Sequence, residues 1–275
     1  MRSMIIYPSK EALIAEIQSD LDAGLNVYLY TDCSNNARQS EFDQLLAALT
    51  PRAKSVKRLD KAGFADPSNK DYLSDLTNNI TEQLVICSPA MNSGVSIESD
   101  HFDSVYVLGR GTTLPTELIQ APPRVRKMKE VRIYIDAHKY NNGLSINPDF
   151  VLEEELLKES SAGYEVTPDF KQEMLAKPGV ADVIDQIVYE NGMRANYANT
   201  FYHIAMLHNY VLSYSDKIAT EEEEKEISAA KARAEAQRIA QVAAEEEIDA
   251  ATAKKIIEKD AMSRAEECKL YKYQL

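Results

Sequence analysis

Long apolar runs are missing from this sequence of 275 residues. No stretch approaches the roughly 20 consecutive apolar residues that a membrane-spanning helix needs, and no charged-then-apolar leader is recognisable. We therefore expect neither a membrane protein nor a secreted one, but a soluble protein of the cytoplasm. Hydrophobic residues still make up 44% of the chain, which is enough to bury a core and excludes wholesale disorder.

Cysteine is scarce as well. Cys33, Cys87 and Cys268 are odd in number and far apart, which fits a reducing compartment and argues against a disulfide framework. They show no metal-ligand spacing, so we expect no metal site in this chain. Cys33 follows Asp32 and has no neighbouring cation to activate it, which favours a structural thiol over a nucleophile.

Basic residues are outnumbered, with 31 Lys and Arg against 44 Asp and Glu and a formal net charge of −13. This balance argues against a free-standing nucleic-acid binder, because cations that neutralise phosphates supply much of such affinity. The acidic excess is uneven: residues 1–140 carry 16 basic and 18 acidic residues, and residues 141–275 carry 15 and 26. Within the first part, residues 110–132 hold six basic residues against two acidic ones.

Short apolar segments alternate with helix-like segments along residues 1–140. This alternation predicts an α/β fold, in which a parallel sheet is flanked by helices on both faces. Ligands bind such sheets at the carboxyl ends of the strands, so the loops after the strands deserve most scrutiny. We expect strands at 26–30, 54–59, 83–87, 104–108 and 131–135, a strand-like start around 4–8, and helices at 9–24, 35–49 and 69–79.

From about residue 141 the strand signal stops, and we expect an acidic, all-α accessory region over residues 141–275. Breaks are expected at Pro168, Pro178 and Gly192. Residues 221–262 are strong helix formers whose apolar positions are mostly Ala, which predicts surface or loosely packed helices interrupted near 248–252. The chain is thus predicted to divide at residue 140.

Two loops have compositions suited to binding phosphate. The first follows the strand at 83–87 and contains Ser88, Gly94 and Ser96. A hydroxyl at a strand end and a glycine-containing turn let backbone N–H groups approach a phosphate closely. An ordinary strand-to-loop turn is the alternative interpretation.

The second loop precedes the strand at 131–135 and contains Gln120, Arg124, Arg126 and Lys127. Three cations within four residues, preceded by two prolines, suit an anion held in a fixed geometry. A solvated basic turn is the alternative here.

Taken together and in this order, the segments resemble motifs IV, V and VI of superfamily 2 helicases. The segments are Tyr-Thr-Asp at the end of the strand expected at 26–30, SPAMNSGVSIE after the strand expected at 83–87, and PTELIQAPPRVRK before the strand expected at 131–135. Their wording is similar to replicative helicases, primase-helicases and origin-binding helicases of plasmids, phages and other mobile elements. The resemblance covers roughly residues 9–140 and implies a RecA-like fold, ATP with Mg²⁺ as cofactor, and single-stranded or unwinding duplex DNA as partner.

The resemblance also implies roles for individual residues. Gln120 and Arg124 match the Gln and the first arginine finger of motif VI, and either Arg126 or Lys127 matches the second finger. The usual Gln-Arg-x-Gly-Arg-x-Gly-Arg pattern is not followed, so the choice between the last two stays open. These residues are expected to be catalytic, with Lys127 also counted in the nucleotide site.

Motifs V and IV supply the remaining candidates. Ser88 and Gly94 match motif V, and Ser96 occupies a position where many relatives carry Asp. Gly94 and Ser96 are therefore expected at the nucleotide, whereas Ser88 is expected along the nucleic-acid track. Thr31, Asp32 and Ser34 match motif IV, and Thr31 and Ser34 are expected to contact a nucleic-acid phosphate.

The phosphate-cradling half of such a motor is missing. The sequence has no Gly-x-x-x-x-Gly-Lys-Ser/Thr loop and no Asp-Glu pair after an apolar strand. We expect an N-terminal P-loop domain in a longer protein, or a separate partner, to supply that half, and we expect this chain alone not to hydrolyse ATP.

Two other functions remain open. One is a non-catalytic helicase-like scaffold of a replication complex, whose acidic helices bind other replication proteins. The other is a small-molecule α/β enzyme that holds a phosphorylated substrate with Arg124 and Arg126.

Overall fold

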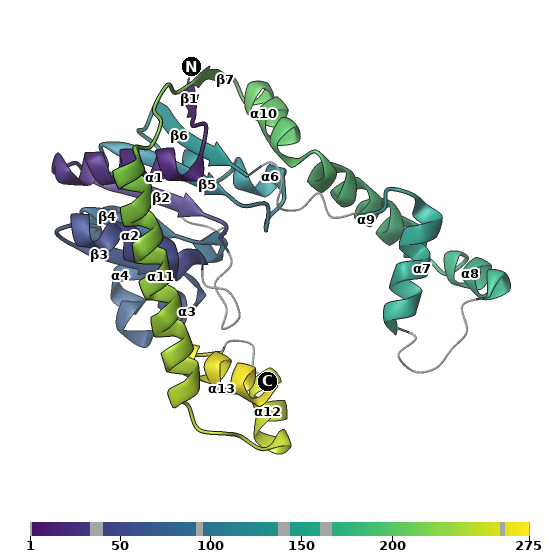
Figure 1. Ribbon diagram of the computed structural model, residues 1–275. Helices are drawn as coiled ribbons and strands as arrows, with labels where there is room; N and C mark the ends of the chain where they lie inside the picture. Colours follow the sequence, from purple (N-terminus) through teal and green to yellow (C-terminus); the bar gives the residue numbers. More distant parts are fainter. Residues whose placement is uncertain are drawn as a thin grey trace.

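The computed structural model describes residues 2–33, 41–91, 96–136, 144–159, 167–258 and 262–274. One sheet runs through this part of the chain in the order β3-β4-β2-β5-β6-β1-β7, and all its strand pairings are parallel (Figure 1). The predicted α/β class is therefore confirmed. The strands are β1 (Arg2–Ile6), β2 (Val27–Thr31), β3 (Val56–Leu59), β4 (Leu84–Cys87), β5 (Ser104–Gly109), β6 (Glu130–Ile135) and β7 (Tyr210–Tyr214).

The central strands are buried on both faces, which explains why β2, β4 and β5 appear in the sequence as continuous apolar runs. Successive side chains of a strand point to opposite faces of the sheet. Along β2, Val27 and Leu29 accordingly enter one hydrophobic core, whereas Tyr28 and Tyr30 enter the other.

Helices cover both cores. Side chains of α1 (Lys10–Asp22), α2 (Glu41–Leu49) and α11 (Glu221–Ala244) fill the first core. The second core is filled from α5 (Leu76–Asn79), α6 (Pro115–Leu118) and α10 (Tyr197–Leu207). The other helical segments are η1 (Thr50–Arg52), α3 (Lys61–Ala65), η2 (Pro67–Asn69), α4 (Lys70–Ser74), η3 (Pro89–Met91), η4 (Pro122–Arg124), α7 (Pro148–Glu159), α8 (Pro168–Leu175), α9 (Val180–Ala195), α12 (Ala250–Ile257) and α13 (Arg264–Gln274).

Local capping decides where the early helices begin and end. Ser9 caps α1 by accepting a hydrogen bond from the Ala12 N–H (3.0 Å), as the sequence predicted. The single helix predicted over 69–79 is wrong, because the chain leaves helical geometry at Asp75 (φ −146°, ψ 74°). The Asp75 carboxylate accepts from the Asn78 N–H and so starts α5 as a separate helix.

The region after residue 140 is not entirely helical. Strand β7 pairs in parallel with β1 and forms one edge of the sheet, so the predicted end of the strand signal near residue 141 is wrong. The strand is short, follows α10 directly after Asn209 (φ 62°), and buries only Tyr210. The sheet therefore draws on both sides of the predicted division at residue 140.

Helix α11 is packed more closely than its composition suggested. Ile227 and Ala230 are buried against α1 and α2, where the small alanine side chain lets helices approach each other. Ion pairs from Arg52 to Glu226 (2.7 Å) and from Lys231 to Glu11 (2.8 Å) fix the helix across this face. The helix is therefore a surface helix, as predicted, but the face around Ile227 and Ala230 is not loosely packed.

The predicted breaks in the later helices mostly hold. Residues 245–249 separate α11 from α12, next to the interruption expected near 248–252. Pro168 opens α8 and Pro178 lies between α8 and α9, but Gly192 lies inside α9. Among the described helices, none is both long and apolar enough to cross a membrane.

Three helices stand away from the sheet (Figure 1). Helices α7, α8 and α9 form a small hydrophobic core of their own around Val151, Leu152, Leu156 and Ile184. We refer to α7–α9 as the helical head. It is linked to the sheet through α10, which packs in the second core.

A buried carboxylate clamps α1 to two neighbouring strands. The Oδ2 atom of Asp20 accepts hydrogen bonds from Ser104 Oγ (2.6 Å), Tyr106 Oη (2.7 Å) and Arg132 Nη1 (2.9 Å). Arg132 Nη1 also donates to Tyr106 Oη (2.7 Å). Burial raises the pKa of the Tyr106 hydroxyl, so this group remains a hydrogen-bond donor at neutral pH.

Substitution Asp20→Ala is expected to lower the free energy of unfolding by about 3 kcal/mol, because it removes the acceptor of two buried hydroxyls and one carboxylate partner of Arg132, which keeps Glu16 and Glu130. Urea denaturation followed by circular dichroism measures the loss. Asp22→Ala is the matched control on the same helix: its side chain is 50% exposed and pairs with Arg52, so we expect a loss of about 0.5 kcal/mol or less. Equal losses in the two variants would contradict a clamp at Asp20.

Candidate functional site

The two loops singled out in the sequence meet in the folded chain. Ile97 and Val125 form an isolated parallel β-bridge, in which the Ile97 N–H donates to the Arg124 carbonyl (2.8 Å) and the Arg126 N–H donates to the Ile97 carbonyl (3.0 Å). Both bridging side chains are buried in the second core. The loops therefore belong to one continuous surface.

Polar side chains join across this bridge. Arg126 Nε donates to Ser96 Oγ (2.8 Å), and the Ser96 carbonyl accepts from Thr77 Oγ1 (3.2 Å) beside it. Lys127 forms an exposed ion pair with Asp100 (2.7 Å). Ser96, Arg126 and Lys127, which the sequence predicted as site residues from separate motifs, thus lie on neighbouring parts of one surface.

Arg124 lies partly beneath this surface. It occupies η4, and its Nε atom is buried. Its positive charge acts on Cys87 and Tyr28, where it opposes the rise in pKa that burial causes. An arginine whose Nε atom is buried is not the cation of a fully solvated turn, which argues against that alternative for Arg124.

Gln120 is exposed and turned back on its own helical turn. Its Nε2 atom donates to the Thr116 carbonyl (3.0 Å), the usual reach of one helical turn. Within the described part of the chain, no hydrogen bond joins Gln120 to the cations of the loop. A contact between Gln120 and a ligand held by these cations would require another rotamer of its side chain.

The predicted nucleic-acid residues are mostly enclosed. Thr31 is fully buried, and its hydroxyl accepts from the Cys33 N–H (3.1 Å) and donates to Cys33 Sγ (2.9 Å). A direct contact between Thr31 and a phosphate is therefore wrong for this conformation. Ser88 directly follows β4, is buried, and its hydroxyl accepts from the Ala90 N–H (3.3 Å). Ser34 and Gly94 lie outside the described residues.

Asp32 is the residue of this region that the sequence underrated. Its buried carboxylate accepts hydrogen bonds from the N–H groups of Arg110, Thr112 (2.8 Å) and Thr113 (3.1 Å). Burial raises the pKa of Asp32, and these donors oppose the rise. The signal in the sequence was that Asp32 and Arg110 each follow a strand, β2 and β5, which pair in the sheet.

Arg110 completes a charged network beside Asp32. Its guanidinium forms ion pairs with Glu41 (2.7 Å) and with Asp136, and these carboxylates raise its pKa although burial opposes them. One cation between two carboxylates leaves this network without excess positive charge. It therefore positions loops at the strand ends and is a poor receptor for a phosphate.

The base of the helical head touches the same loops. Arg194 Nη1 of α9 donates to the Gly111 carbonyl (3.1 Å), one residue after Arg110. Phe201 and Tyr197 of α10 lie in the second core together with Leu118 and Ile119 around α6. The segment that leads to Gln120 and Arg124 is consequently held between the sheet and α10.

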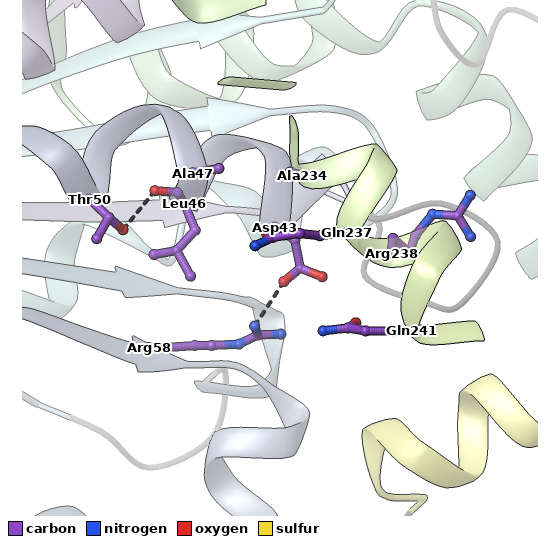
Figure 2. Close-up of a pocket in the computed structure, with 9 residues that line it drawn as sticks. All are labelled: Asp43, Leu46, Ala47, Thr50, Arg58, Ala234, Gln237, Arg238 and Gln241. Atoms are coloured by element: carbon purple, nitrogen blue, oxygen red, sulfur yellow. Dashed lines mark hydrogen bonds and ion pairs between the residues drawn. The ribbon is translucent and has the colours of Figure 1, made fainter. Parts of the chain in front are cut away.

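The face of the sheet that α2 and α11 cover carries a groove. The groove, of about 350 Å³, lies between α2, β3 and α11 and is lined by Asp43, Leu46, Ala47, Thr50, Arg58, Ala234, Gln237, Arg238 and Gln241. Figure 2 shows Arg58 directed at Asp43 (2.8 Å), whereas the guanidinium of Arg238 points away from it. Arg58 also pairs with Asp60, and Arg238 with Glu235 (2.6 Å). Because carboxylates neutralise both arginines, this groove is a weak candidate for binding an anion.

Within the described residues, no group of three or more His, Cys, Asp or Glu side chains is arranged to hold a metal ion. The fold and the loops thus define a three-layer α/β protein with a parallel sheet, whose chemistry-bearing loops follow the strands or connect them. The expected ATP and Mg²⁺ would have to be bound mainly by another domain.

Comparison with known proteins narrows the identity little. No family model matches this chain. A segment of 133 residues, 46% of the chain, is 27% identical to an uncharacterized protein of Picosynechococcus sp. (strain ATCC 27264 / PCC 7002 / PR-6). The match spans 13% of that protein, so the chain corresponds to a small part of a much longer relative. No solved structure matches.

The reactivity of the three cysteine thiols can be tested chemically. All three are buried and none forms a disulfide, and burial raises the pKa of Cys33 to about 11 and that of Cys87 to about 12. We expect the native chain to show no rapid reaction with Ellman's reagent at about pH 8, because the thiolate is the reactive form. The chain unfolded in guanidinium is the control and should react at all three thiols. A fast native thiol would contradict a structural role for the cysteines.

Proposed function

We propose that this chain is the second RecA-like motor domain of an NTP-dependent DNA helicase, which acts in the cytoplasm during replication of a plasmid, phage or other mobile element. The observation that carries the proposal is the bridge between Ile97 and Val125. It brings the Ser96 loop and the Arg124–Lys127 loop together, as a site made from motifs V and VI requires.

In this function the chain supplies charge and not the phosphate cradle. Hydrolysis of a nucleoside triphosphate places negative charge on the transferring phosphoryl group, and an arginine from across a cleft stabilises it by roughly 10³–10⁵-fold in rate. An N-terminal P-loop domain would bind ATP and Mg²⁺. Arg124 would act as the first finger, with Arg126 or Lys127 as the second.

In this function, a movement of the Arg124 side chain would couple ATP hydrolysis to closure of the two motor domains. The Nε atom of Arg124 is buried in this conformation. To reach a nucleotide held by another domain it must turn outward, which links hydrolysis to closure of the cleft. Such a link between chemistry and domain motion is what a translocating motor needs.

The nucleic-acid track follows from the exposed cations of the same surface. Arg126 and Lys127 are exposed, whereas Thr31 is buried. We therefore assign phosphate contacts with single-stranded or unwinding DNA to Arg126 and Lys127 as long as no nucleotide engages one of them as the second finger, with Ser88 at the margin of the track. Binding by two cations on a chain of net charge −13 would be weak and sensitive to salt.

A non-catalytic scaffold of a replication complex is the second candidate. It is favoured by the intramolecular partners of the proposed site residues: Arg126 bonds to Ser96, Lys127 pairs with Asp100, and Gln120 bonds to Thr116. A surface whose polar groups are already satisfied suits a structural role as well as a resting motor. The kinetic experiment below separates the two.

In a protein that contains both motor halves, Arg124→Ala is expected to lower kcat by on the order of 10³-fold or more. Nucleotide affinity should stay within about tenfold, because ground-state contacts come mainly from the P-loop domain. Arg124→Lys should restore little, since a point charge cannot reproduce the guanidinium fork. Steady-state ATPase assays and nucleotide titrations measure both quantities.

Lys129→Ala is the control for Arg124, because it removes an exposed positive charge from the same loop outside the proposed machinery. It should leave kcat unchanged within about twofold. Thermal unfolding of each variant verifies that it is folded. A near-normal ATPase rate in folded Arg124→Ala would refute the finger and favour the scaffold.

For DNA binding, fluorescence titration of the chain with a single-stranded oligonucleotide should show weak affinity that falls steeply with salt. Arg126→Ala and Lys127→Ala should each reduce the slope of log K against log salt by about one. Lys225→Ala removes an exposed cation from α11 and should leave the slope unchanged. Tight, salt-resistant binding would contradict an electrostatic track at these residues.

A further inference from the structure

The helical head carries an open apolar groove apart from the helicase-like surface. The groove has a volume of about 390 Å³ and lies where the second half of α7 meets the end of α8 and the start of α9. It is lined by Leu152, Glu155, Leu156, Met174, Pro178, Gly179, Val180, Val183 and Ile184. Its volume falls within the roughly 300–1,000 Å³ of ligand-binding pockets.

The wall of the groove is both apolar and exposed. Val183, which lines it, is 58% exposed, and Leu175 next to the lining Met174 is also exposed. Gly179 (φ 83°) makes the tight turn between α8 and α9 and leaves open space where a side chain would stand. A large apolar side chain can therefore enter without rebuilding the turn.

Acidic residues surround this apolar wall. Residues 148–195 hold eleven Asp and Glu against four Lys and Arg. Glu155 of α7 lines the groove, and Glu173 of α8 and Asp182 of α9 each directly precede a lining residue in the sequence. Of the four cations, Lys171 pairs with Glu153, Arg194 is bonded to Gly111, and Lys177 lies at the groove, where its Nζ atom donates to Met174 Sδ (3.0 Å). With Lys177 included, the helical head keeps its excess of acidic residues.

We propose that this groove binds one amphipathic helix of a partner protein, whose apolar side chains enter between α7 and α9 and whose Lys and Arg residues face the acidic rim. Grooves between helices commonly accept a helix through apolar anchors at positions i, i+3, i+4 and i+7. The acidic rim adds selectivity, because it attracts a basic helix and repels an acidic one.

The negative charge around the groove also indicates which other molecules would not bind there. A nucleic acid brings phosphates against the acidic rim, which repels them. A second copy of the helical head brings the same net negative charge and is repelled as well. The groove is separate from the Ser96 and Arg126 surface, so this proposal stands whether or not the chain is part of a helicase.

The test uses the full chain and a fluorescein-labelled peptide of about 18 residues that contains only Leu and Lys, patterned as an amphipathic helix. A second peptide carries Glu in place of each Lys. Fluorescence anisotropy at about 0.15 M salt should show saturable binding of the Lys peptide and at least about tenfold weaker binding of the Glu peptide. No binding of the Lys peptide at about 100 µM, or equal binding of the two peptides, would overturn the proposal.

Two variants locate the binding. Val183→Lys places a charge in the groove and should weaken binding of the Lys peptide at least about tenfold. Tyr189→Lys adds the same charge at a 60% exposed position of the same helix that does not line the groove, and should weaken it by less than about threefold. Equal weakening would show general electrostatic attraction and overturn the proposal.

Folding is verified by circular dichroism, and Val183 is exposed enough for the substitution to be tolerated. Hydrogen exchange of the unmodified chain gives an independent measurement. Bound Lys peptide should slow exchange in residues 152–156 and 180–184 and leave α11 unchanged. Protection located elsewhere would equally overturn the proposal.

Discussion

The carboxylate of Asp32 ties the end of β2 to the loop after β5, and the surface with the candidate site depends on this tie. Three backbone N–H groups converge on a side chain that water does not reach. The loop that it fixes continues into α6 and then into η4 with Arg124. A buried charge is stable only when its hydrogen bonds are complete, so the geometry of this loop is narrowly defined.

The C-terminal half completes the fold that the N-terminal half begins. Strand β7 covers the outer side of β1, and α11 covers α1 and α2 with its alanine face. Helix α10 presses on α6 from the opposite face, and Arg194 reaches Gly111 from the helical head. A displacement of the head by a bound partner would therefore act on the segment that carries Gln120 and Arg124.

The two proposals assign different chemistry to different ends of the molecule. The surface around Ser96 and Arg126 carries the cations that we propose to meet phosphates, whereas the groove of the helical head is apolar with an acidic rim. Between them, α9 and α10 connect the two regions, with a break in helical geometry at Asn196 (φ −127°, ψ 45°). Within a longer protein, the first would work on nucleotide and DNA and the second would recruit a partner.

The sequence determined the α/β class, the five strands from β2 to β6, the capped start of α1 and the two chemistry-bearing loops, because these follow from local patterns of apolar, capping and turn residues. It could not determine that β7 joins the sheet, since a short edge strand acquires its partner only from a segment some 200 residues away. Nor could it show that Thr31 is enclosed, that the Nε atom of Arg124 is buried, or that Asp32 holds the loop after β5. Burial and pairing at these positions depend on segments distant in the sequence, and only the tertiary structure brings those segments together.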